Sequence, residues 1–179
     1  RYIVVTGLAN MLVVDQRAAH ERILFESMMK DLASHNAATQ KLLWPETIQS
    51  STADAAVLRE LVPHLQTLGF DVAEFGHDTF IIHGIPAIMT DLISPQQAIE
   101  DILDRFKEGH QMMEMKPVEK IAFVMASNLS RRRGEIMTTE EMQSLIEQLM
   151  ASDNPYASPS GRKTFITFGK EEILKRFQS

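Results

Sequence analysis

Three carboxylates near the start of the chain have the residue type and the spacing that could bind a divalent cation: Asp15, Glu21 and Glu26. Mg²⁺ and Mn²⁺ accept carboxylate and water oxygens as ligands, and a metal held in this way can activate a water molecule for hydrolysis. Glu21 and Glu26 lie five residues apart, which is about 140° around a helix, so they cannot both point straight at one ligand. Together with Asp15 they could line a shallow acidic edge.

A junction between a strand and a helix would position these carboxylates. The apolar run 11–14 is typical of a buried strand, and in residues 16–33 the apolar side chains recur at helical spacing. Asp15 stands at the junction, where it can cap the helix. A simpler interpretation of the same residues is that Asp15 is only an N-cap, and that Glu21 and Glu26 are solvated helix charges.

The rest of the chain mixes strand and helix patterns. A capping box formed by Thr138 and Glu141 marks one helix start. The predicted elements are a strand at 2–6 that pairs antiparallel with 11–14, the helix at 16–33, a strand at 47–49, a helix at 53–68, a hairpin at 70–83, helices that begin at Pro95, at Pro117 and after Thr138, a strand at 164–168 and a helix at 170–177. This mixture predicts an α+β fold.

Length and composition limit the classes of function. The 179 residues, 44% of them apolar, suffice for one domain with a sizeable core or with two lobes. The net charge of −6 argues against a freestanding nucleic-acid binder. The absence of cysteine excludes disulfides and thiolate metal sites. No apolar run approaches the ~20 residues of a membrane span, so we expect a cytoplasmic protein without a membrane partner.

Three stretches match known motifs in the same order along the chain. Residues Asp15 to Glu26 resemble the pattern DQHA(X)2E(X)4E, residues Gln40 to Pro45 resemble Q-x-L-L-x-P, and Ser158 to Thr164 stand in the place of CPHGRPT. These motifs belong to the C-terminal domain of the MutL family of bacterial DNA mismatch repair proteins, the first and third in those members that nick DNA. The resemblance extends over nearly the whole chain.

The resemblance implies a two-lobed α+β domain. Residues 1–44 and 126–179 would form a dimerisation lobe, and residues 45–125 an inserted external or regulatory lobe. The domain would form a homodimer, so that N-terminal ATPase domains, absent from this chain, bind ATP and close on DNA to couple mismatch recognition to repair. The implied partners are this ATPase domain, the mismatch-recognition protein MutS, the replication sliding clamp and, weakly, DNA. The protein would associate with the nucleoid during repair.

Surplus apolar residues near both ends of the chain predict where two copies meet. They lie in residues 2–14, 145–150 and 165–168. Because the chain has no disulfide to stabilise such surfaces, we expect them to be buried in a homodimer interface.

The alternative function is a metal-dependent endonuclease that nicks the newly made DNA strand. Asp15, Glu21 and Glu26 would be its catalytic residues, with Asp15 and Glu21 holding Mn²⁺ or Mg²⁺. Four positions depart from the nicking pattern, which has His or Cys where this chain has Arg17, Ser127, Ser158 and Ser160. Because a guanidinium and serine hydroxyls are poor metal ligands, a family-type zinc site is not expected. The sequence leaves open whether the chain is an enzyme.

Arg17 brings a permanent positive charge to the predicted acidic edge. It could pair with Asp15 or Glu21 and so replace the structural part of a metal's role. In the competing interpretation Arg17 points to solvent, and both carboxylates stay available to Mn²⁺.

The segment Gln40–Pro45 also has two interpretations. By resemblance it is the peptide through which the family binds the sliding clamp, with Gln40 as hydrogen-bonding anchor. Alternatively it is an ordinary edge strand whose leucines belong to the core. The other residues of the segment that the resemblance assigns to binding are Leu42, Leu43, Trp44 and Pro45.

Overall fold

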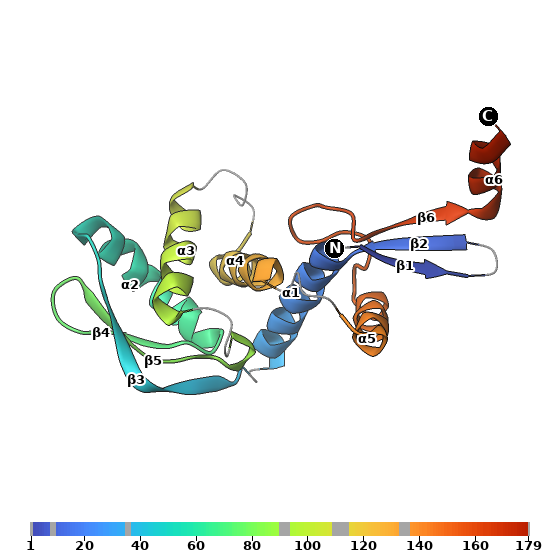
Figure 1. Ribbon diagram of the computed structural model, residues 1–179. Coiled ribbons are helices and arrows are strands. Elements are labelled where there is room, and N and C mark those ends of the chain that lie inside the picture. Colours follow the sequence, from blue (N-terminus) through green and yellow to red (C-terminus); the bar gives the residue numbers. More distant parts are fainter. Residues whose placement is uncertain are drawn as a thin grey trace. The chain divides into compact units, whose positions relative to one another are not determined.

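The computed structural model describes residues 2–7, 10–34, 37–89, 94–108, 115–132 and 137–178. The α+β prediction is confirmed, because helices and two small sheets share the chain (Figure 1). The elements are β1 (Tyr2–Thr6), β2 (Asn10–Asp15), α1 (Gln16–Ser34), β3 (Thr39–Gln49), α2 (Thr52–Thr67), β4 (Asp71–Glu74), β5 (Thr79–Pro86), η1 (Ala87–Met89), α3 (Pro95–Glu108), α4 (Pro117–Arg132), α5 (Thr139–Met150), β6 (Phe165–Gly169) and α6 (Lys170–Gln178). Strand β3 begins earlier than the sequence pattern predicts. Among the described residues, no helix combines the length and apolar character needed to cross a bilayer.

The chain divides into two units. The first unit contains Arg1–Glu26 and Ser130–Ser179, and the second contains Ser27–Leu129. The boundaries therefore lie inside α1 and α4, and the lobes implied by the resemblance, with boundaries at residues 44 and 126, stay a prediction. Helical periodicity continues unchanged across such a boundary, so a sequence pattern has no feature that marks it.

The first unit is built on an antiparallel sheet with the strand order β1-β2-β6. On one face, Ile3 pairs with Val14 across the strands, and Val14 pairs with Phe165. These side chains pack on Ala19 of α1 and on Leu145 and Leu149 of α5, which lies on one side of the sheet (Figure 1). The capping box of Thr138 and Glu141 starts α5, as predicted from the sequence.

The opposite face of this sheet is also mostly apolar, and it is only partly covered within the first unit. Because side chains alternate between faces, the paired residues Val4, Val13 and Ile166 share one row, and the paired residues Met11 and Phe168 lie in the next. Val4 is 56% exposed and Ile166 is 43% exposed. We call these five residues the exposed sheet face.

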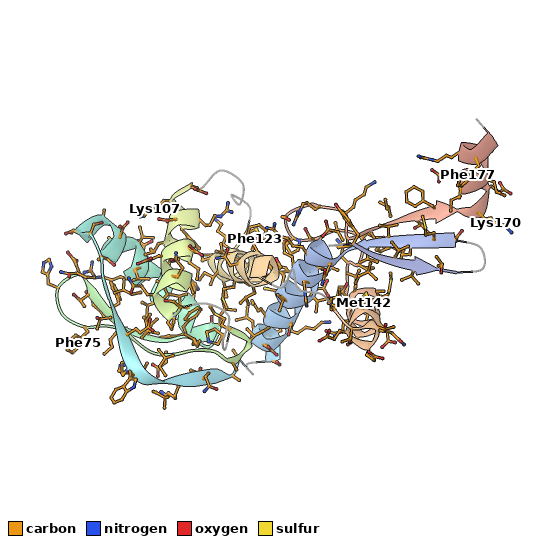
Figure 2. All side chains as sticks on the ribbon, in the orientation of Figure 1. Phe75, Lys107, Phe123, Met142, Lys170 and Phe177 are labelled. Atoms are coloured by element: carbon orange, nitrogen blue, oxygen red, sulfur yellow. The ribbon has the colours of Figure 1, made fainter. Side chains whose placement is uncertain are left out.

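The second unit contains the antiparallel sheet β3-β5-β4. Helices α2 and α3 contact this sheet, and their apolar stripes form a core with Phe80 and Ile82 of β5. The predicted hairpin is confirmed as the antiparallel pair β4 and β5. At its turn, Asp78 adopts a φ of 53°, a left-handed conformation that Asp tolerates better than most residues. Figure 2 shows the side chains of both units.

Candidate functional site

Asp15 has the geometry of a helix N-cap. It is the last residue of β2, and its Oδ1 accepts hydrogen bonds from the backbone N–H groups of Arg17 (3.0 Å) and Ala18 (3.1 Å). These are the second and third residues of α1, whose N–H groups have no partner inside the helix. The backbone N–H of Asp15 donates to the carbonyl of Thr164 at 2.8 Å, which connects the helix start to the segment before β6.

Glu21 is buried rather than solvated. Glu21 is 1% exposed, and its Oε2 accepts a hydrogen bond from the Ser160 hydroxyl at 3.1 Å. The guanidinium of Arg162 lies 3.7 Å from the same oxygen. Its other oxygen, Oε1, has no hydrogen-bond partner among the described residues. The interpretation of Glu21 as a solvated helix charge is therefore wrong, since this carboxylate faces a serine hydroxyl and one arginine.

Glu26 is likewise buried, and backbone groups occupy both of its oxygens. The N–H groups of Asp153 and Asn154 donate to Oε2 and Oε1 at 2.8 and 3.2 Å. Arg22, one helical turn earlier, lies 3.5 Å from Oε1 and donates through Nε to the carbonyl of Ala157 at 2.7 Å. The solvated interpretation is thus wrong for Glu26 too. Sequence reasoning missed the role of Arg22, although its spacing of four residues from Glu26 was a usable signal.

A tight turn brings Ser160 and Arg162 to Glu21. The N–H of Gly161 donates to the carbonyl of Ser158 at 2.9 Å, and the N–H of Ser158 donates to the carbonyl of Arg162 at 2.8 Å. Gly161 has a φ of 78°, which only glycine adopts without steric cost. The hydroxyls of Ser158 and Ser160 lie 2.8 Å apart. This places two of the four divergent family positions next to Glu21.

These contacts define a polar junction between α1 and the loop at 152–164. Its members on the helix are Glu21, Arg22 and Glu26, and those on the loop are Ser160 and Arg162. All of them belong to the first unit. The arrangement joins segments that are distant in sequence, and its chemistry is that of hydrogen bonding and ion pairing.

The described residues do not fit a divalent metal. No group of three or more His, Asp or Glu side chains comes together in the part of the chain that the structure describes. Asp15 caps α1, Glu26 binds the loop backbone, and the cation beside Glu21 is Arg162. The backbone N–H of Arg17 donates to Asp15, and the guanidinium that lies beside Glu21 is that of Arg162, a residue to which the sequence interpretation gave no such role.

The fourth divergent position is Ser127. It is buried in α4 and belongs to the second unit. A buried hydroxyl at this place is compatible with helix packing.

The segment Gln40–Pro45 lies in β3, which is an edge strand of its sheet. Its pairing with β5 is interrupted between Lys41 and Glu46. In this interruption Leu43 is 93% exposed and Trp44 is 83% exposed. The edge-strand part of the alternative interpretation is therefore right, but its assignment of the leucines to the core is wrong for Leu43.

Comparisons with known proteins agree with the motifs. Residues 1–137 match the family described as MutL C terminal dimerisation domain. The DNA mismatch repair protein MutL of Parabacteroides distasonis is 33% identical over 178 residues, which are 99% of this chain and 29% of the relative. The corresponding protein of Flavobacterium johnsoniae is 33% identical over 177 residues, which are 99% of this chain and 27% of the relative.

A third relative gives the same result. MutL of Opitutus terrae is 32% identical over 182 residues, and the match covers 99% of this chain and 28% of the relative. The chain thus spans less than a third of the length of these relatives. The folded elements, the ordered motifs and the match over residues 1–137 lead to one assignment: the chain belongs to the MutL C-terminal dimerisation domain family.

Proposed function

We propose that the chain joins two protomers of a longer mismatch repair protein through the exposed sheet face, so that N-terminal ATPase domains can act as a pair on DNA. The observation that carries this proposal is that the β1-β2-β6 sheet is apolar on both faces. A sheet with one face in water normally alternates apolar and polar residues. Here Val4 and Ile166 alternate with the equally apolar Ile3 and Phe165.

A second copy of the chain is the partner that fits this surface. The family is one of dimerisation domains, and closed two-fold dimers bury the same patch of both subunits. The row Val4, Val13 and Ile166 would then lie near the centre of the contact. An obligate interface of this kind buries more than about 2,000 Å² in total, so further surface must contribute.

Sedimentation analysis of charge variants tests the proposal. Wild-type chain is expected to be dimeric at micromolar concentration, and Val4→Lys or Ile166→Lys should weaken dimerisation by about 100-fold or more, because two copies of a lysine would meet in a desolvated contact. Thr167→Lys is the matched control, since Thr167 is exposed and lies next to Ile166 on the opposite face of the sheet. A wild-type chain that is monomeric at about 100 μM would refute the proposed dimer.

A second function concerns the Gln40–Pro45 segment. We propose that it docks into an apolar pocket of the replication sliding clamp, the partner that its motif implies. Its support is the exposure of Leu43 and Trp44 at an interrupted strand edge. Leu43 and Trp44 are adjacent in the chain, and contiguous exposed apolar surface marks binding sites where single exposed residues do not; aromatic anchors contribute strongly to such contacts.

The test combines affinity and stability. The double variant Gln40→Ala, Leu43→Ala should weaken binding to the sliding clamp at least about 10-fold while the melting temperature changes little, because neither side chain is buried. Phe75→Ala is the control, as Phe75 is an exposed aromatic residue of the same unit outside the segment. Equal loss of affinity in both variants would contradict a segment-specific contact.

The contact with MutS and the weak contact with DNA, both implied by the resemblance, stay predictions. The same holds for nicking activity, which the contacts of Asp15, Glu21 and Glu26 do not favour over a structural role. Incubation of the chain with supercoiled plasmid and Mn²⁺, alone and with the sliding clamp, measures it directly.

A further inference from the structure

The C-terminal helix α6 has an apolar stripe that its own unit covers only in part. Ile173, Leu174 and Phe177 are spaced so that they lie on one side of a helix. Leu174 is 48% exposed and Phe177 is 86% exposed. Figure 2 labels Phe177 on α6, beyond the end of the sheet.

A helix of this length needs a partner surface. Helix α6 has nine residues, and isolated helices shorter than about 12 residues are marginal in water. The described element that α6 mainly contacts is β6, the strand that it directly follows. Packing of the apolar stripe on another surface would supply the missing stabilisation.

The position of α6 points to the dimer contact. Ile166 and Phe168 of β6 belong to the exposed sheet face, and α6 begins at Lys170. The apolar stripe of α6 therefore continues, along the chain, the surface that we assign to dimerisation. A single second copy of the chain can cover both surfaces in one symmetric contact.

The charges of α6 match a second α6. Its first turn contains Glu171 and Glu172, and its last turn contains Lys175 and Arg176, of which Arg176 already lies 3.5 Å from Glu172 within the helix. Two copies that run antiparallel would place the acidic turn of each beside the basic turn of the other, in a symmetric contact. Leu174 is close to the middle of the helix, so the two Leu174 side chains would meet at the symmetry axis.

We propose that α6 packs antiparallel against α6 of a second copy, with Leu174 and Phe177 as the apolar contact. This inference rests on the proposed homodimer and adds a second contact to it. The contact between the two α6 helices would supply part of the interface area that the three strands of the sheet are too small to bury.

Engineered cysteines test the arrangement, because the natural chain contains no cysteine. Leu174→Cys in the 179-residue chain should form an interchain disulfide rapidly with oxidised glutathione, since two cysteines near the axis can approach to bonding distance. Lys170→Cys is the control. Antiparallel pairing keeps its two copies roughly 12 Å apart along the helix axis, so it should cross-link at least about 10-fold more slowly.

A second measurement does not depend on cysteine. Phe177→Ser should weaken dimerisation about 10-fold or more in sedimentation experiments, whereas Lys170→Ser should not. Circular dichroism spectra check that each variant is folded. Hydrogen exchange of the α6 amides should also slow as the wild-type concentration rises through the dimer dissociation constant.

The outcomes separate this inference from the proposed dimer. A wild-type monomer would refute both. A wild-type dimer that tolerates Phe177→Ser, shows no preferential cross-link at Leu174→Cys and leaves α6 exchange unchanged would refute the helix pairing alone. Preferential cross-linking at position 174, together with a weakened Phe177→Ser dimer, would establish the pairing.

Discussion

Glu26 is the residue on which the polar junction depends most. Its two oxygens receive the N–H groups of Asp153 and Asn154, and Arg22 lies beside it. Glu26→Ala should therefore reduce the free energy of unfolding by about 1–3 kcal/mol, because two backbone N–H groups and the largely buried Arg22 guanidinium lose their acceptor. Urea denaturation measures this change. The exposed Glu60 of α2 supplies the control variant Glu60→Ala, for which we expect a change within about 0.5 kcal/mol.

Metal binding gives a second prediction at the residue scale. We expect calorimetric titration with Mn²⁺ to detect no saturable site of micromolar affinity, because Asp15 caps α1 and Arg162 places a positive charge beside Glu21. Zinc analysis of the purified chain should likewise find no stoichiometric metal. A micromolar Mn²⁺ site that Asp15→Asn abolishes would overturn this expectation and support the alternative function as a metal-dependent endonuclease.

Among the elements, α2 and the β4–β5 turn are joined by a charged cluster around Asp78. The Thr52 hydroxyl donates to Asp78 Oδ2 at 2.8 Å, and the Arg59 guanidinium lies 3.1 Å from Oδ1. The hydrogen bond from Thr52, followed by that from Arg59 and the nearby charge of His77, lowers the pKa of Asp78 below its ordinary value of 3.8. The cluster therefore favours the ionised carboxylate in the folded state.

This pKa shift predicts the pH dependence of stability. A depressed pKa in the folded state stabilises the fold above the unfolded pKa, and the contribution is lost as the pH falls through the folded value. Asp78→Asn should therefore lower the urea midpoint at pH 7, and the difference from wild type should shrink as the pH falls below 3.8. Asp31→Asn, at an exposed position on α1, is the control. A difference that stays constant from pH 7 to pH 3 would contradict the role of the ionised carboxylate.

At the scale of the whole molecule, dimerisation should couple stability to concentration. If two copies fold and associate together, the melting temperature of the wild-type chain should rise by about 2 °C for each tenfold increase in concentration. Val4→Lys should remove this dependence, because its chain melts as a monomer. Calorimetric scans at several protein concentrations measure both. A melting temperature that is independent of concentration in the wild type would argue against coupled folding and association.

The sequence by itself determined the class of fold and most of the elements. The capping box of Thr138 and Glu141 and the apolar spacing of α1 act within one or two helical turns, so their consequences can be derived from neighbouring residues. The order of three motifs pointed to the family in the same way. These signals are local, and the structure preserves them.

Only the tertiary structure decided what the singled-out residues do. Glu26 binds a backbone N–H that lies 127 residues away, and Glu21 meets a hydroxyl 139 residues away. No periodic pattern in the sequence indicates either the Asp153 N–H or the Ser160 hydroxyl as a partner. In the sequence Glu21 and Glu26 therefore resemble solvated helix charges, although the fold buries them. The exposure of Leu43 follows from the interrupted pairing of β3 with β5, and the unit boundary after Glu26 lies within an unbroken helix. Burial is a property of contacts between distant segments, and sequence spacing records only the contacts of near neighbours.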